Sequence, residues 1–170
     1  QGVKKIVRKN RRSVAVLDGS ETTKELEGLA NDVFSYFGLG CRNVSKLFLP
    51  KGFNLDRLFK AFYPFNGVGE HKKYANNYEY NKTILLMGGN KLIENGFLLM
   101  KEDKSLLSPT AMLYYEYYND IETVEQFIEE NAEQLQCVVS KKGISFGNTQ
   151  QPNLWDYADG VDTVEFLRGL

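Results

Sequence analysis

Residues 13–49 read SVAVLDGSETTKELEGLANDVFSYFGLGCRNVSKLFL, and this stretch decides the fold. Short apolar runs stand at its two ends, SVAVL at residues 13–17 and VSKLFL at residues 44–49. Runs of this kind, bounded by turn residues, are typical of strands buried in a parallel sheet. Two successive parallel strands need a crossover connection, which is usually a helix.

The segment between the two runs has the pattern of such a helix. Thr22 and Glu25 have the spacing of a capping box, in which a hydroxyl and a carboxylate satisfy free backbone N–H groups. Apolar residues follow at the spacing of one helix face, and Gly38 ends the series. These apolar residues are Leu26, Leu29, Ala30, Val33, Phe34 and Phe37. The stretch therefore predicts a strand–helix–strand unit.

The rest of the chain continues this alternation. We expect helices at residues 54–62, 70–82, 121–131 and 161–167, strands at residues 83–87, 96–101, 111–117 and 136–140, and connections at residues 63–69, 105–110 and 143–155. Asn54 and Asn119 are the expected caps of two of the helices. The predicted fold class is α/β: one three-layer α/β/α domain over residues 1–170, with a mostly parallel sheet.

Composition limits the classes of function. The chain has 170 residues and a formal net charge of −1, which lacks the basic excess of a nucleic-acid or anionic-membrane binder. No apolar run approaches the length of a membrane span, and the N-terminus has no signal-peptide pattern. It also lacks an initiator Met and leads from Gln1 straight into a basic segment. We expect a fragment of a longer cytoplasmic protein.

The chain has two cysteines, Cys41 and Cys137, and one histidine. No C-x-x-C pair is present, so we expect no metal site. Two cysteines without an export signal favour free thiols in a reducing cytosol. Cys137 lies inside a predicted buried strand, QCVVS, and we interpret it as structural.

Cys41 lies between a glycine-rich turn and a strand, and two interpretations of it are open. Gly38 and Gly40 allow a sharp bend, which can expose the thiol and turn its own N–H toward the same space. Acyl transfer needs such a thiolate and such a donor, and Arg42 could lower the pKa of the thiol. Free cysteines are, however, commonly small buried hydrophobes, and spacing alone favours that second interpretation.

A family resemblance favours the first interpretation. The run YFGLGCRNVSKLFL at residues 36–49 resembles the nucleophile segment of aldehyde dehydrogenases. More closely, the chain resembles the acyl-CoA reductase family, the fatty-acid reductases of the bacterial luciferase operon and their homologues. Residues 106–109 (LLSP) and 156–163 (DYADGVDT) look like the C-terminal half of that family. The nucleotide-binding half should lie before Gln1, because no G-x-G-x-x-G motif is found here.

The resemblance implies an aldehyde-dehydrogenase-like catalytic domain that reduces a fatty acyl-CoA to an aldehyde with NADPH. Cys41 would be the catalytic nucleophile and coenzyme A the leaving group. Gly38, Gly40, Arg42 and Asn43 would form the loop around the oxyanion. The acyl donor would be acyl-CoA or an acylated protein, and a homo-oligomer of the full-length protein is left open. The alternative is a module of this fold that holds acyl groups or docks a partner without reducing anything.

Two departures from the superfamily pattern narrow this expectation. Hydrolytic aldehyde dehydrogenases carry a Glu some thirty residues before the nucleophile, whereas residues 5–10 here read KIVRKN. Without this base to activate water, transfer of the acyl group to or from a thiol is favoured over hydrolysis of the acyl-enzyme. The Glu-Ile-Phe-Gly-Pro motif, whose Glu holds a cofactor ribose, is replaced by SLLSP at residues 105–109. Ser105 and Pro109 are therefore the expected cofactor contacts of this half, and NADPH would be bound mainly by the other half.

Four further features have a functional and a structural interpretation, and the structural one is favoured for each. His71 could be a general base for Cys41 or the start of an exposed helix. An aromatic cluster could stack on a base or pack in a sheet. A set of aspartates could bind calcium or cap helices, although its spacing does not fit an EF-hand. A basic N-terminus could contact cofactor phosphates or be a solvated linker. The last three sets are Tyr114, Tyr115, Tyr117 and Tyr118; Asp156, Asp159 and Asp162; and Lys4, Lys5, Arg8, Lys9, Arg11 and Arg12.

Overall fold

The computed structural model describes residues 5–7, 10–157 and 160–169. Within them, one sheet of six strands has the order β3-β4-β5-β2-β1-β6. All neighbouring strands are parallel except β3 and β4. The strands are β1 (Arg12–Val16), β2 (Val44–Pro50), β3 (Ile93–Glu94), β4 (Leu99–Glu102), β5 (Met112–Tyr118) and β6 (Leu135–Val139). The predicted α/β class with a mostly parallel sheet is confirmed.

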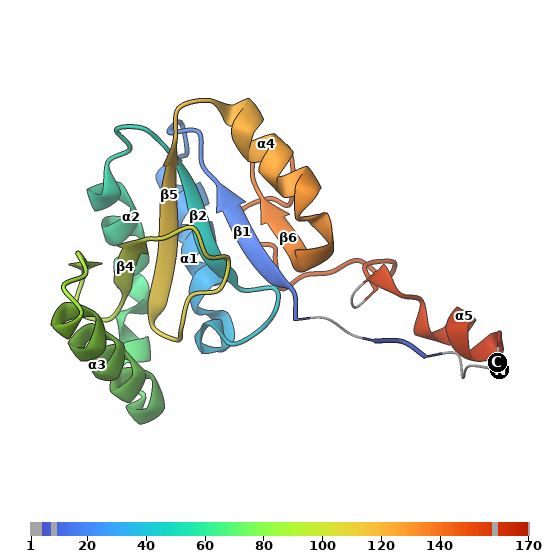
Figure 1. The fold of residues 1–170 in the computed structure, drawn as a ribbon, viewed down its shortest axis with the longest axis horizontal. Helices are drawn as coiled ribbons and strands as arrows, with labels where there is room; N and C mark the ends of the chain where they lie inside the picture. The colour runs from blue at the N-terminus through green and yellow to red at the C-terminus, as the bar shows by residue number, and fades with distance from the viewer. Residues whose placement is uncertain (1–4, 8–9, 158–159, 170) are drawn as a thin grey trace.

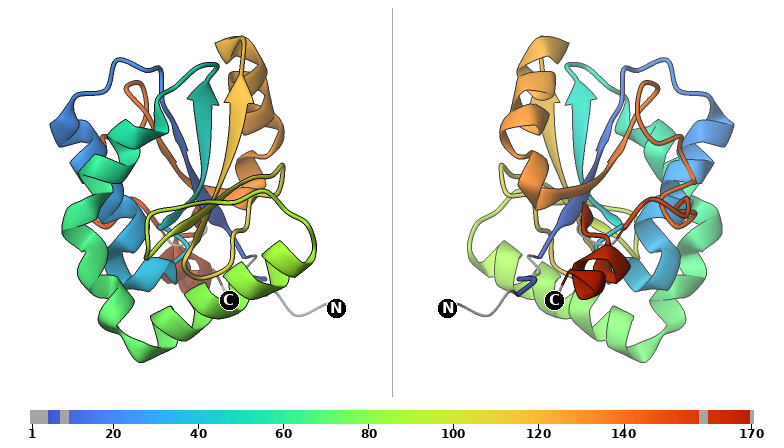
Figure 2. Two further views of the ribbon diagram at one scale, coloured as in Figure 1. Left: turned by 90° about the vertical axis from the view of Figure 1, so that its left-hand side faces the viewer. Right: turned by 90° about the vertical axis from the view of Figure 1, so that its right-hand side faces the viewer.

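Helices cover both faces of this sheet (Figures 1 and 2). α1 (Thr23–Phe34) and α2 (Leu55–Phe62) lie on one face, and α4 (Ile121–Glu130) lies on the other. α3 (Lys72–Met87) crosses below the β4 side, while α5 (Thr163–Arg168) lies away from the sheet beyond β6. Short 3₁₀ segments are η1 (Ser35–Gly38), η2 (Tyr63–Glu70) and η3 (Ala132–Gln134). The expected three layers are therefore present.

The core follows the alternation of side chains along the strands. Leu47 and Leu49 of β2 are fully buried against the α1 and α2 side, whereas Phe48 packs with Val124 of α4 on the other side. α3 packs through Tyr74 and Tyr78 on a separate cluster that includes Leu99 and Met112. In the part of the chain that the structure describes, no helix has the length and apolar character needed to cross a membrane.

Three of the predicted elements are wrong. Residues 83–87 were expected as a strand but form the last turns of α3, which runs unbroken from Lys72 to Met87. A short apolar run does not by itself distinguish a strand from a helix, and here the buried Tyr74 and Tyr78 hold one helix face on the core. Residues 63–69 are 3₁₀ turns and not an irregular loop. Asp120, and not Asn119, caps α4 by accepting from the Glu122 N–H.

The first helix also ends earlier than its apolar stripe predicts. α1 stops at Phe34, and Tyr36 and Phe37 take left-handed backbone angles, with φ of 52° and 59°. Such angles cost roughly 1–2 kcal/mol for each non-glycine residue. The Phe37 ring packs against the rings of His71 and Tyr74, and these contacts offset part of that cost. The chain therefore turns sharply just before Cys41.

Candidate active site

Cys41 lies in the turn that leads into β2, at the amino edge of the parallel sheet. It is an exposed free cysteine, whereas Cys137 is free and buried. Ser13, at the start of β1, donates from its hydroxyl to the Cys41 carbonyl at 2.9 Å, and it stands beside Cys137 in the sheet register. Burial raises the pKa of the Cys137 thiol, which disfavours its reactive form. Of the two thiols, Cys41 is the one open to a reagent.

Asn43 holds the turn together from inside. Its side-chain oxygen accepts from the Gly40 N–H at 2.9 Å, and its amide donates to the carbonyls of Asp32 at 3.0 Å and Ser35 at 2.8 Å. The Asn43 N–H also donates to the Gly40 carbonyl at 3.1 Å. A Cβ on Gly40 would lie 2.9 Å from the Asn43 side-chain oxygen, so a larger residue here would displace the Asn43 amide. Gly38, with φ of 72°, completes the left-handed run.

Arg42 is held by a distant part of the chain. Its Nε donates to the carbonyl of Thr149, 107 positions away. Thr149 is bound in turn by Asp32 of α1, whose carboxylate accepts from the Thr149 N–H at 3.0 Å and from its hydroxyl at 2.8 Å. Asp32 also accepts from the Gly147 N–H at 2.6 Å. The Cys41 turn, α1 and residues 147–149 thus form one connected unit.

Sequence reasoning missed Asp32, Thr149 and Ser13. Asp32 is three residues after Leu29 and is fully buried, although it lies in a helix read only for its apolar stripe. A carboxylate at helical spacing from a core leucine was the available signal. No sequence pattern marks Thr149 as a functional residue, because it lies within residues 143–155, which are predicted to be a connection.

Of the two expected cofactor residues, Pro109 lies at the same edge of the sheet as Cys41, whereas Ser105 follows the carboxyl end of β4. The Ser45 hydroxyl donates to the Leu106 carbonyl at 2.7 Å, which ties the connection before β5 to the start of β2. Ser105 is exposed and donates its N–H to Asp103 at 2.9 Å. Pro109 and Gly38 line the same small cavity, whose volume of about 20 Å³ suits one water molecule. This set of polar groups is too small to hold a dinucleotide by itself.

The structure places some of the other features, and the linker interpretation of the basic N-terminus is wrong for Arg12, which lies in β1. His71 is the exposed residue just before α3; its side chain makes no capping hydrogen bond, and its ring lies 4.5 Å from that of Phe37. The tyrosines of β5 alternate between the two faces of the sheet, and Tyr118 donates to the Leu17 carbonyl at 2.6 Å. Asp162 caps α5, and the described residues contain no group of three metal-ligating side chains. Arg12 begins β1, whereas Lys4, Arg8, Lys9 and Asp159 lie outside the described residues.

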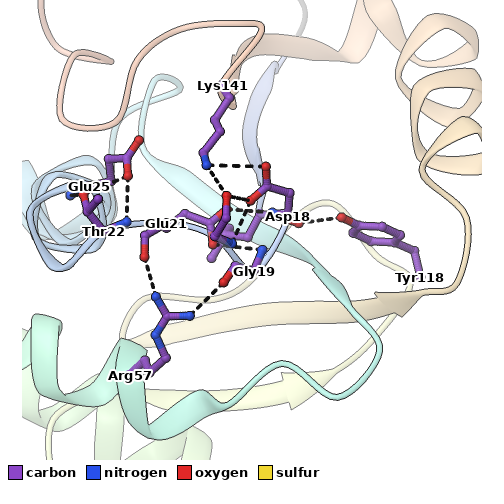
Figure 3. A network of polar contacts seen from close by, with 10 residues as sticks. Asp18, Gly19, Glu21, Thr22, Glu25, Arg57, Tyr118 and Lys141 are labelled. Carbon is purple, nitrogen blue, oxygen red and sulfur yellow. Dashed lines mark hydrogen bonds and ion pairs between the residues drawn. The ribbon is translucent and has the colours of Figure 1, made fainter.

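The opposite, carboxyl edge of the sheet is linked by its own side chains (Figure 3). Glu21, which is buried, accepts from the N–H groups of Asp18 at 2.6 Å and Gly19 at 3.1 Å. Burial raises the pKa of the Glu21 carboxyl. Arg57 donates to the carbonyls of Gly19 and Glu21, and Lys141 pairs with Asp18. A groove of about 420 Å³ lies beside this network, between α4 and β6, and Cys41 is not among the residues that line it.

Of the comparisons with known proteins, the one with solved structures bears on the fold. No family model matches the chain, and no curated protein matches its sequence. An aldehyde dehydrogenase of Mycobacterium tuberculosis, solved with NAD+, is similar in structure with a TM-score of 0.51 at 13% identity, over 82% of this chain and 37% of that one. An indole-3-acetaldehyde dehydrogenase, also solved with NAD+, gives 0.49 at 11% identity, over 70% and 31%. The chain therefore spans about a third of the length of each of these enzymes. The Mycobacterium tuberculosis structure shows similarity of fold alone, over the part of that enzyme which this chain matches.

Proposed function

We propose that this chain is the nucleophile-bearing part of an acyl-CoA reductase, which reduces a fatty acyl thioester to an aldehyde through an acyl-Cys41 intermediate. The observation that carries the proposal is the exposed free thiol of Cys41 in a turn held from several sides. The aldehyde dehydrogenase fold and the motif around Cys41 support it. The substrate would be an acyl-CoA or an acylated protein, and the full-length enzyme is proposed to use NADPH.

The residues of this chain would carry out the acyl transfer. The Cys41 thiolate attacks the acyl carbonyl, the bond from carbon to the coenzyme A sulfur breaks, and coenzyme A leaves as a thiolate that takes up a proton. Within the described residues no hydrogen bond uses the Cys41 backbone N–H, so this donor is free to stabilise the oxyanion. NADPH, when bound mainly by the other half of the protein, would supply the hydride that releases the acyl group as an aldehyde.

An acyl adduct tests this proposal directly. The chain is incubated with a long-chain acyl-CoA and its intact mass and peptide map are recorded. We expect one acyl group on Cys41, no adduct in Cys41→Ser, and an unchanged adduct in Cys137→Ser, because Cys137 is buried. An unmodified Cys41, or an adduct on Cys137 instead, would contradict the proposal.

The alternative is a module that holds acyl groups or docks a partner without reducing them. The full-length protein separates the two functions, because the acylated enzyme can be supplied with NADPH and assayed for aldehyde. Aldehyde release supports the reductase, whereas a stable adduct without aldehyde supports the acyl-holding module. The isolated chain is expected to form the adduct and to release no aldehyde.

A further inference from the structure

Asp32 is a buried carboxylate without a cation to balance it. Its residue is fully buried, and among the described residues no lysine, arginine or histidine forms an ion pair with it. The donors to its oxygens within residues 5–7, 10–157 and 160–169 are uncharged: the N–H groups of Gly147 and Thr149 and the Thr149 hydroxyl. Burial accordingly raises the pKa of this carboxyl, and its hydrogen bonds oppose the rise. A buried carboxylate without a cation lowers the stability of a fold, so an apolar side chain at position 32 would give a more stable domain.

Hydrogen bonds connect Asp32 to the two residues that follow Cys41. Thr149, held by the Asp32 carboxylate, uses its carbonyl to accept from Arg42 Nε. The Asp32 carbonyl, on the main chain of the same residue, accepts from the Asn43 amide at 3.0 Å. One residue of α1 therefore holds both residues that follow Cys41.

We propose that Asp32 and Thr149 are positioning residues for Cys41, which act by holding the side chain of Arg42, the next residue in the chain, in a fixed place in the Cys41 turn. The inference rests on the proposed function for its purpose, since a fixed cation at this place would attract the phosphates of coenzyme A. One consequence does not depend on that function. Loss of the Asp32 carboxylate should free the Arg42 side chain, and the Cys41 turn should then attract anions less strongly.

Two alkylating reagents of different charge measure this pull on the chain itself. Iodoacetate is anionic and iodoacetamide is neutral, and both add to the same sulfur. The ratio of their rate constants at Cys41, followed by peptide mass, reports the local field, whereas a general loosening of the turn changes both rates together. We expect Arg42→Gln to lower the ratio roughly three- to fivefold, the effect of one unit charge several ångströms away near the surface.

Asp32→Asn should lower the ratio by a similar factor. A fall in the ratio would distinguish the two effects of this variant. Removal of the negative charge of Asp32 would by itself speed the reaction with anionic iodoacetate and raise the ratio, whereas release of Arg42 lowers it. Thr149→Val removes the hydroxyl bond to Asp32 but keeps the backbone bonds to Asp32 and Arg42, so it should lower the ratio by less, about twofold, while Thr149→Ser keeps the hydroxyl and should keep the ratio. In the double variant Asp32→Asn/Arg42→Gln the ratio should fall no further than in Arg42→Gln alone, as expected for residues that act through one another.

A ratio that stays unchanged or rises in a folded Asp32→Asn variant would overturn the proposal, as would effects that multiply in the double variant. If Asp32→Asn does not fold, the comparison of Thr149→Val with Thr149→Ser decides, and equal ratios in these two reject it. Acyl-CoA takes no part in these reactions. A missing acyl adduct together with the expected ratios would therefore reject the proposed function and leave the positioning role intact.

Discussion

Asn43 shows how much a single side chain contributes to the turn around Cys41. Its amide group serves the Gly40 N–H and the carbonyls of Asp32 and Ser35, and the residue is buried. Removal of such a group leaves backbone polar atoms without partners, and each unsatisfied buried atom costs about 1–3 kcal/mol.

We expect Asn43→Ala to lower the free energy of unfolding by about 2–3 kcal/mol and to increase the rate at which iodoacetamide modifies Cys41. Denaturation in urea and alkylation kinetics measure the two effects. Asn43→Asp is a matched control, because it keeps the acceptor for Gly40 but loses the two donated hydrogen bonds. Stability equal to that of the unaltered chain in Asn43→Ala would contradict this role.

Lys46 is a second residue whose polar contacts are buried. Its side chain is inaccessible to solvent, and Nζ contacts Glu116 at 2.8 Å and the Asp103 carbonyl at 2.9 Å. Since Glu116 remains 35% exposed, part of its charge would stay solvated if Lys46 were lost. We expect Lys46→Met to destabilise the domain by roughly 2–3 kcal/mol, less than a fully buried pair would lose. Lys142→Met, which breaks an exposed pair with Glu125, should leave the urea midpoint nearly unchanged.

At the scale of elements, α1 is the part of the fold that builds the candidate site. It begins with the capping box of Thr22 and Glu25, buries its apolar stripe under the sheet, and presents Asp32 and Gly28 to residues 146–149. The contact at Gly28 is close: a Cβ there would lie 2.8 Å from the Phe146 carbonyl oxygen. The glycine at position 28 therefore allows residues 146–149, which follow β6, to pack closely on α1.

Gly28→Ala tests this contact. In an exposed helix the change would stabilise, but here we expect a loss of about 1–3 kcal/mol, since neither backbone can move away freely. Thermal unfolding followed by circular dichroism measures it. Gly67→Ala is the control, because a Cβ at Gly67 meets no atom within 4 Å and should be neutral or slightly stabilising. Equal melting temperatures for the two variants would show that residues 146–149 do not pack tightly on α1.

Element prediction succeeded where a pattern was long or had a local stop signal. The capping box and apolar stripe defined α1, and short apolar runs defined β1, β2 and β6 within one or two residues. It failed at residues 83–87, where the four apolar residues 84–87 continue a helix whose buried face is set by Tyr74 and Tyr78. It also failed at Tyr36 and Phe37, which take left-handed angles; the Phe37 ring contacts His71 and Tyr74, which lie far along the chain and could not be read from the local pattern.

At the scale of the whole molecule, acid should weaken the fold in part through Asp103. A hydrogen bond from Lys101, followed by one from the Ser105 N–H, lowers the pKa of Asp103 to about 2. Because the folded pKa lies below the unfolded value of about 3.9, the stability from this carboxylate is present above about pH 4 and is lost as the pH falls toward 2. Asp32, with its raised pKa, contributes in the opposite direction.

We therefore expect Asp103→Asn to reduce the stability lost between about pH 4 and pH 2. Urea unfolding at pH 5, 4, 3 and 2 gives the two curves. The variant should be less stable than the unaltered chain at pH 5, and its curve should fall less steeply below pH 4. Parallel curves over this range would show that the bonds of Asp103 do not favour its charged form in the folded state.

The candidate site was predictable only in its local part. Gly38, Gly40, Arg42 and Asn43 are neighbours of Cys41 in the chain, so a short motif was enough to name them. Asp32 and Thr149 are 117 positions apart and meet only in the folded domain. A pattern read within one stretch of sequence contains no information about such a pair, because its members are placed by the whole sheet.

The bond between Arg42 and Thr149 also has a consequence for how the protein is made. The two residues are 107 positions apart, so the ribosome adds Thr149 roughly 5–20 s after Arg42 at ordinary rates of synthesis. During that interval Cys41 is already part of the nascent chain, but the partner that fixes its neighbour does not yet exist. The thiol on which the proposed chemistry depends is thus present in every newly made copy for several seconds before the bond that holds its neighbour can form.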